Sequence, residues 1–383
     1  MRNLHARGLV AVASVLAMSA VIAGLSSRSI GADAPAMTPE IEAELTALVA
    51  KNTSTPDFVA PGDPIDIKSI LGGKLLYSIP VTSANPFTEG IFSSVKKLAP
   101  KIGFTFKEWE NQGKLDEWQR GIEQAITDHA AIIDESGGCD PRLTGPQIAD
   151  AHKAGLKVVD SHASGLTQGI SANVDATLGA PYEPTGELQA AYAALKSKGK
   201  AHVLIITSDE ITGSPVQTKA IKDALAKYCP QCKVSVTNAA VAQWATSVPA
   251  AVRGALLADP SLDYILPLYD PETPFIVPVL KQLAKPGTVH VVTYAGTPSA
   301  LDAIAQGDYV SMDVGESNEN IGMALIDLEA RVIKGDVKPP VDRKIALRIW
   351  DSTNVKEAGT PATYSVGYGD AIRNGYFKLW GLN

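Results

Sequence analysis

From residue 74 onward, short apolar runs alternate with longer stretches whose apolar residues recur at helical spacing, as Phe87, Ile91 and Val95 do. The alternation occurs in two sets, separated by the region around Pro184. The apolar runs are 75–79, 104–106, 131–133 and 156–159 in the first set, and 203–206, 234–236, 264–266 and 289–292 in the second. Short apolar strands joined by helices are typical of parallel sheets covered on both faces. The pattern therefore predicts an α/β protein with two doubly wound, Rossmann-like lobes.

Residues that follow the apolar runs are the candidates for function, because ligands of doubly wound sheets bind beyond the carboxyl ends of the strands. The candidates at or near such ends are Asn85, Phe87, Asp134, His162, Trp244, Tyr269, Asp270 and Tyr294. Aromatic faces can cover the C–H surface of a small hydroxylated ligand while polar side chains fix its hydroxyl groups. Two alternatives stay open: Asp134 and Glu135 could cap the next helix, and His162 could be structural.

The amino terminus has the pattern of a secretory signal peptide. Arg2, His5 and Arg7 precede an apolar stretch at 9–25, and small residues surround Ala34. We expect residues 1–34 to be a signal peptide that is cut after Ala34. A retained membrane anchor is the alternative, since the stretch approaches spanning length. No cysteine lies near the proposed cut, so we expect a periplasmic protein without a lipid anchor.

Charge and motifs exclude several classes of function. The formal net charge is −7 and no basic patch is present, which argues against nucleic-acid binding. The sequence contains no H-E-x-x-H, P-loop, G-x-G-x-x-G or G-x-S-x-G motif. Its six histidines are scattered without metal-ligand spacing. We therefore expect a binding protein without metal or cofactor, and not an enzyme.

The three cysteines are Cys139, Cys229 and Cys232. In an oxidising compartment, the pair at 229 and 232 is a candidate for a local disulfide. The competing interpretation is a redox C-x-x-C motif, which belongs at the start of a helix, where the helix dipole lowers a thiol pKa. Here the pair follows a helical stretch at 218–227 instead. The redox interpretation, a periplasmic C-x-x-C oxidoreductase, is therefore the weaker one. Cys139 has no predicted disulfide partner and is expected to be a free thiol.

Several motifs from 74 to 383 resemble the ribose-binding type of periplasmic solute-binding proteins of ABC importers. Asn85-Pro86-Phe87 is similar to the Asn-Pro-Phe of that family, and residues 289–298 (VHVVTYAGTP) resemble its V-x-V-V-G-F-D-G-T-P. The order and spacing of the motifs together carry the resemblance. DNA-binding repressors share the core fold but begin with a helix-turn-helix, where this chain has the signal-peptide pattern.

The resemblance implies two lobes that close on a ligand in the cleft between them. It also implies a hinge of three crossing strands, near Asn173, Glu316 and Ile349. We accordingly expect an extension and linker at 35–72, a first lobe made of 73–173 plus 317–348, and a second lobe made of 174–316 plus 349–383.

Carried over residue by residue, the resemblance adds Gln217 and Glu316 to the candidate ligand-binding residues. Gln217 falls near an arginine of the family, and Glu316 matches its hinge glutamine. His162 stands where sugar binders often have aspartate, Trp244 replaces a stacking phenylalanine, and Ala295 replaces a hydrogen-bonding aspartate. The charged groups that hold sugar hydroxyls are therefore largely replaced by aromatic ones.

The expected function is the substrate-binding component of an ABC transporter. We expect a monomer that captures a sugar, sugar derivative or polyol and delivers it to the transmembrane subunits of a permease. Two alternatives share the same sequence features: a sensory protein that serves a chemoreceptor or kinase, and a binder of a small aromatic compound.

Overall fold

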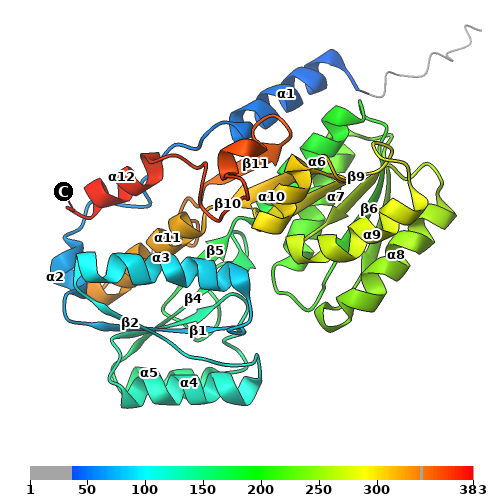
Figure 1. Ribbon diagram of the computed structural model, residues 1–383. Coiled ribbons are helices and arrows are strands. Elements are labelled where there is room, and N and C mark those ends of the chain that lie inside the picture. Colours follow the sequence, from blue (N-terminus) through cyan, green and yellow to red (C-terminus); the bar gives the residue numbers. More distant parts are fainter. Residues whose placement is uncertain (1–36, 337–339, 383) are drawn as a thin grey trace, which may run out of the picture. The chain divides into compact units, whose positions relative to one another are not determined.

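The computed structural model describes residues 37–336 and 340–382. The predicted signal peptide and its cut after Ala34 lie outside the described residues. Two sheets are present, as predicted (Figure 1). Among the described residues, no helix combines the length and the apolar character needed to cross a membrane.

The first sheet is parallel throughout and has the strand order β2-β1-β3-β4-β5. Its strands are β1 (Leu75–Pro80), β2 (Thr105–Glu108), β3 (Ile132–Ser136), β4 (Lys157–Gly165) and β5 (Ala176–Ala180). Successive strand residues point to opposite faces, so a continuous apolar run is needed where both faces are covered. Leu76 accordingly joins one hydrophobic cluster and Tyr77 another.

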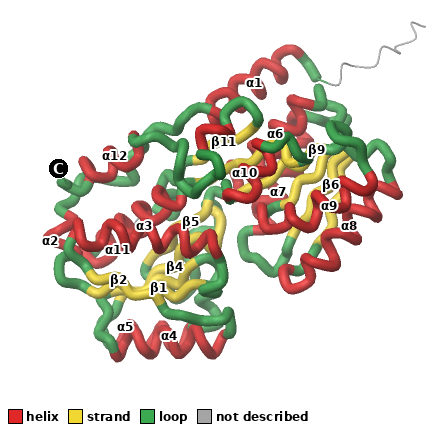
Figure 2. Tube along the Cα trace, in the orientation of Figure 1, coloured by secondary structure: helices red, strands yellow, loops and turns green. Residues whose placement is uncertain are grey.

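Helices cover both faces of the first sheet (Figure 2). One face carries α2 (Ile67–Leu71), α3 (Pro86–Ile102), α11 (Asn318–Lys334) and α12 (Ala371–Leu379). The other face carries α4 (Leu115–Thr127) and α5 (Gly145–Lys153). We call this sheet with its helices lobe one.

The second sheet has the order β11-β10-β9-β8-β6-β7, with β11 antiparallel to β10 and the other pairs parallel. Its strands are β6 (His202–Thr207), β7 (Lys233–Asn238), β8 (Tyr264–Pro267), β9 (His290–Ala295), β10 (Val310–Glu316) and β11 (Leu347–Asp351). The predicted runs of the second set are all strands, so the doubly wound fold is confirmed.

Helices again cover both faces of this sheet, which together form lobe two. On one face lie α1 (Pro39–Thr53), α6 (Tyr182–Lys196) and α7 (Ser214–Tyr228). On the other lie α8 (Trp244–Ala258), α9 (Thr273–Leu283), α10 (Pro298–Ala305) and the short helix η3 (Val355–Ala358). Two further short helices, η1 (Val241–Gln243) and η2 (Asp270–Glu272), precede α8 and α9.

The predicted lobe boundaries need two corrections. β5 pairs with β4, so lobe one continues to Ala180 and the first crossing lies beyond it, whereas Asn173 lies in the β4–β5 loop. The carboxyl-terminal segment was expected in lobe two as a whole. β11 does belong there, but α12 buries Ile372, Tyr376 and Trp380 in the core of lobe one. Glu316 does end β10, immediately before α11 and its cap residue Ser317.

The chain therefore crosses between the lobes five times along the described residues, and not three times as predicted for the hinge. The two additional crossings are the connection from α1 to α2 and the one from η3 to α12. Both are needed because the amphipathic faces of α1 and α12 find their apolar partners in different lobes.

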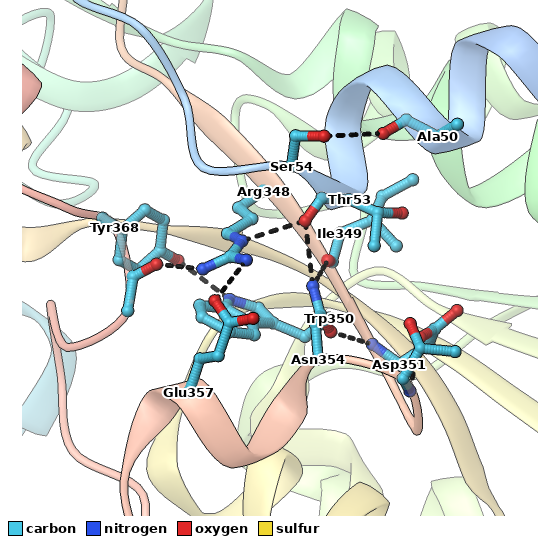
Figure 3. Close-up of polar contacts among 12 residues, drawn as sticks. Ala50, Thr53, Ser54, Arg348, Ile349, Trp350, Asp351, Asn354, Glu357 and Tyr368 are labelled. Carbon is cyan, nitrogen blue, oxygen red and sulfur yellow. Dashed lines mark hydrogen bonds and ion pairs between the residues drawn. The ribbon is translucent and has the colours of Figure 1, made fainter.

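Arg348 of β11 joins three separate segments of the chain (Figure 3). Its side chain is 3% exposed. It donates from Nε to the Thr53 carbonyl at 3.1 Å and from Nη2 to Glu357 Oε2 at 2.6 Å, and it also contacts the Gly367 carbonyl. Asn354 Nδ2 donates to the same Thr53 carbonyl at 3.0 Å. The end of α1 is thereby fixed to lobe two.

Candidate functional site

Side chains from both lobes line a cavity of about 150 Å³. Lobe one contributes Asn85, Phe87, Thr88, Ile91, Gly137 and His162, and lobe two contributes Tyr182, Ile211, Trp244, Tyr269, Pro271, Tyr294, Ala295 and Thr297. Six candidates from the sequence are thus brought together: Asn85, Phe87, His162, Trp244, Tyr269 and Tyr294. None of the described side chains that line the cavity is Asp, Glu, Lys or Arg.

Helix α3 places Asn85 and Phe87 at the cavity. The Asn85 side chain accepts a hydrogen bond from Phe87 N at 3.0 Å and so caps the helix. Pro86 occupies the first turn, where its missing N–H and fixed φ are favourable. The Asn-Pro-Phe sequence therefore both starts the helix and positions the phenylalanine ring.

Aromatic rings form a continuous row across the cavity. The ring centroids are 5.1 Å apart for Phe87 and His162, 6.0 Å for His162 and Tyr182, 6.5 Å for Tyr182 and Tyr269, and 6.0 Å for Tyr182 and Tyr294. These separations lie in the range of favourable edge-to-face contacts. The row begins in lobe one and ends in lobe two.

Tyr182 is a site residue that the sequence interpretation missed. It lies at the start of α6, two residues after β5 ends at Ala180. The same strand-end rule would have found it, but the β5 sequence Ala-Thr-Leu-Gly-Ala is too short and weakly apolar to stand out as a strand.

His162 is held by Glu316 across the lobe boundary. His162 Nε2 lies 2.6 Å from Glu316 Oε2, and both side chains are buried. His162 adopts a left-handed backbone with φ of 54°, at a register shift in the pairing of β4 with β5. Such bulges redirect side chains. Glu316, also predicted as a ligand contact, does not itself line the cavity and contacts it only through His162.

Asp134, Gln217 and Asp270 were also predicted as ligand contacts, but the structure does not bring them to the cavity. Asp134 lies inside β3 and accepts from Ser78 Oγ at 3.2 Å. Gln217 donates to Gln189 Oε1 at 3.0 Å in the core between α6 and α7. Asp270 accepts from Thr293 Oγ1 at 2.9 Å and from Thr297 N at 2.8 Å.

Burial changes the ionisation of these interior acids. It raises the pKa of Asp134 to about 7 and that of Glu135 to about 7, against hydrogen bonds from serine and threonine that lower both. Burial also raises the pKa of Asp270 and, together with repulsion from Asp270, that of Asp313. Ionising a carboxyl group in such surroundings costs free energy. These side chains instead form hydrogen bonds to the strands and loops around them.

Cys229 and Cys232 are joined in a disulfide with a Cα–Cα distance of 5.3 Å. The bond lies between the end of α7 and the start of β7, and neither cysteine lines the cavity. Cys139 is free and buried, and burial raises the pKa of its thiol well above the ordinary value. Across the described part of the chain, no group of three or more His, Cys, Asp or Glu is placed to hold a metal ion.

Comparison with protein families identifies the class. A family profile described as "Periplasmic binding protein domain" matches residues 76–336, which is more than half of the chain. The chain belongs to this family. The match spans both sheets and ends just after α11, so the extension at 37–72 and the segment that carries β11 and α12 lie outside it. The search of curated proteins gave no match.

Several solved structures have a similar fold. An ABC transporter solute-binding protein from Mycobacterium smegmatis with bound glycerol has 20% sequence identity and a TM-score of 0.64, over 77% of this chain and 99% of that one. One from Burkholderia graminis in complex with D-arabinose has 21% identity and a TM-score of 0.63, over 74% and 96%. An arabinose-transporter component from Shewanella sp. ANA-3 has 15% identity and a TM-score of 0.63, over 79% and 97%.

Proposed function

We propose that this protein is the substrate-binding component of an ABC importer and that it binds a small, uncharged solute between its lobes. The observation that carries the proposal is the cavity whose walls come from both lobes. Phe87 and His162 stand on one side, and Trp244, Tyr269 and Tyr294 on the other. A ligand that touches both sets binds the closed state better than the open state and shifts the population toward closure.

The ligand class follows from the walls and from the relatives. The similar structures named above hold glycerol, D-arabinose or L-arabinofuranose. Neutral polar groups and aromatic faces, as at Asn85 and Trp244, suit a sugar, sugar derivative or polyol. Membership in a family of periplasmic binding proteins also supports export by the segment at 1–34 and delivery to the transmembrane subunits of a permease. We take the working form to be a monomer.

The proposal is tested by combining thermal-shift measurements with small-angle X-ray scattering. A panel of neutral sugars, polyols and cyclic alcohols is screened against the purified protein. A ligand at 100 times its Kd should add about 2.7 kcal/mol to the free energy of unfolding. The same ligand should reduce the radius of gyration, because the lobes close. Stabilisation without compaction would contradict capture between the lobes.

A further inference from the structure

Two of the aromatic side chains in the cavity have their polar atoms engaged by the protein. Trp244 Nε1 donates to Ser208 Oγ at 2.9 Å and to the Ala239 carbonyl at 3.1 Å. The Tyr269 hydroxyl lies 2.9 Å from Ser214 Oγ. These side chains therefore offer ring surface to a ligand and little hydrogen-bonding capacity.

The remaining polar side chains of the cavity include no Asp, Glu, Lys or Arg, and are those of Asn85, Thr88, His162, Tyr182, Tyr294 and Thr297. Asn85 uses its side-chain oxygen, Oδ1, to cap α3. Thr297 Oγ1 lies 3.3 Å from Ser299 Oγ. The Tyr294 hydroxyl is buried and has no hydrogen-bond partner in the described part of the chain. Each ligand hydroxyl that is buried without a partner weakens binding roughly tenfold or more. The described lining has no Asp, Glu, Lys or Arg side chain to form the charge-assisted hydrogen bonds that hold sugar hydroxyls most strongly.

The volume of the cavity limits the size of the ligand. It is about 150 Å³, and an engineered apolar cavity of about that volume in another protein holds a benzene molecule. Resting on the proposed function, we propose that the ligand is an uncharged molecule built on one ring, with fewer hydroxyl groups than a pentose or hexose. Trp244 and Phe87 would cover its faces.

Calorimetric titration with named probes tests this assignment. Phenol, benzyl alcohol and cyclohexanol are compared with glycerol, D-arabinose and L-arabinose, and benzoate serves as the charged match for benzyl alcohol. The tightest ring alcohol should bind at least tenfold more tightly than either arabinose. Benzoate should bind at least tenfold more weakly than benzyl alcohol, because the described lining contains no Lys or Arg side chain to pair with it and His162 already faces Glu316.

The outcomes separate this inference from the proposed function. If an arabinose or glycerol binds more tightly than every ring alcohol and compacts the protein, the inference is overturned while the proposed function stands. If no probe binds, the inference is overturned, while the proposed function is decided by the broader panel and the scattering measurement described above.

A second, independent observation concerns the extension at 37–72, which is fixed to both lobes. At its start, α1 buries Leu45 and Val49 against α6 and neighbouring elements of lobe two. Glu44 Oε1 lies 2.9 Å from Lys227 Nζ and 3.1 Å from the Tyr228 hydroxyl. Arg348 and Asn354 hold the Thr53 carbonyl, as described above (Figure 3).

The rest of the extension is bound to lobe one. The Phe58 ring packs edge-on against Tyr376 at 5.0 Å, and a side chain at Gly375 would place its Cβ 2.1 Å from Phe58. Arg331 Nη2 donates to the Asp63 carbonyl at 2.8 Å. Ile65 N donates to the Leu379 carbonyl at 2.9 Å, and Ile65 and Ile67 lie in the core of lobe one.

Residues 54–57 are the short link between these two anchors. A fully extended chain advances about 3.6 Å per residue, so Thr53 and Phe58 cannot separate by more than roughly 18 Å while both stay bound. The link crosses between the lobes beside β11, the strand that follows the crossing from α11. We infer that residues 37–72 form a strap that limits how far the lobes open and thereby raises the population of binding-competent protein.

Lengthening the link tests the strap without removing either anchor. Six Gly/Ser residues are inserted after Ser54, which adds about 20 Å of reach. The matched control carries the same insertion between Pro286 and Gly287, an exposed turn within lobe two. Spin labels at Glu123→Cys in α4 and Lys222→Cys in α7 report the distance between the lobes without ligand. Cys139 is buried and the other two cysteines form a disulfide, so the spin label should react only with the two introduced cysteines.

The insertion after Ser54 should extend the inter-lobe distance distribution toward longer distances, and the control should not. Ligand affinity should weaken about two- to tenfold in the first variant, because the competent fraction falls. Because the distances are measured without ligand, this result does not depend on the proposed function. Identical distance distributions in the two variants would overturn the strap.

Discussion

Aromatic and acidic candidates follow strands of the same two sheets, but the structure uses them differently. The aromatic ones, Phe87, Trp244, Tyr269 and Tyr294, line the cavity. The acidic ones, Asp134 and Asp270, are fully buried and bond to protein groups. A position near a strand end is therefore not sufficient to make a side chain part of the site.

For Asp134 the cause is the position at which its strand ends. The apolar run at 131–133 suggests an end at Ile133, but β3 continues through Asp134 and Glu135 to Ser136. Serine and threonine neighbours make this possible, since Ser78 donates to Asp134 and Thr144 donates to Glu135 at 2.7 Å. Polar residues can extend a buried strand when their hydrogen bonds are satisfied.

The largest effect is expected for Asp270→Ala. Two buried donors, Thr293 Oγ1 and Thr297 N–H, lose their acceptor, and each orphaned donor costs roughly 1–3 kcal/mol. Urea unfolding should show a loss of roughly 2–6 kcal/mol, while Asp223→Ala on the exposed face of α7 should change stability little. Ligand affinity should change only a few-fold. A large loss of affinity at unchanged stability would instead place Asp270 in the site and contradict the distinction between the aromatic and the acidic candidates.

Trp244→Ala should weaken ligand binding by roughly 1–3 kcal/mol, the scale of burying one large side chain. Its half-buried ring forms a wall of the cavity. The matched variant is Trp118→Ala, because Trp118 packs on the cluster beneath α4 and does not line the cavity. That variant should lower the melting temperature and leave the affinity unchanged. Calorimetric titration and melting curves on both proteins compare the two roles, and a reversed result would contradict the site assignment.

The interior acids should make stability depend on pH. In the folded protein the pKa of Asp134 and of Glu135 is about 7, above the ordinary 3.8 and 4.5. The folded state therefore keeps protons that the unfolded chain has released. The resulting contribution to the free energy of unfolding is fully present below about pH 4 and is lost as pH rises through about 7.

The double variant Asp134→Asn with Glu135→Gln should flatten this dependence, since neither new side chain titrates. Urea unfolding at intervals between pH 4.5 and 8 measures the slope. Equal slopes in the variant and the parent would show that the two carboxyls are not held in their protonated form.

The smallest effect on binding is expected from replacing Cys229 and Cys232 with serine. A short disulfide loop contributes about 2 kcal/mol of stability by the chain-entropy estimate, so the melting temperature should fall. Ligand affinity should stay within a few-fold, because the bond lies away from the cavity. Loss of binding with the fold intact would favour a functional role for the pair.

The alternation of apolar runs predicts the two sheets, because buried parallel strands must be apolar on both faces. It also predicts six of the fourteen residues that line the cavity. Three features of the structure could not be predicted from this alternation, each for a physical reason. β5 is too weakly apolar to be recognised, which hid Tyr182. The acids at the end of β3 are stabilised by hydroxyl groups that only the folded arrangement brings near. The lobe that receives α12 depends on Phe58 and other partners distant in sequence.

The position of α12 also determines the order in which the protein can fold during synthesis. The core of lobe one includes Tyr376, Leu379 and Trp380, which follow every strand of both sheets along the chain. The sheet of that lobe is made first, yet its core cannot be completed until α12 has been synthesised. The hydrophobic clusters of lobe two contain no residue beyond Tyr368 among the described part of the chain. The lobe whose sheet is synthesised first is thus the last to be finished.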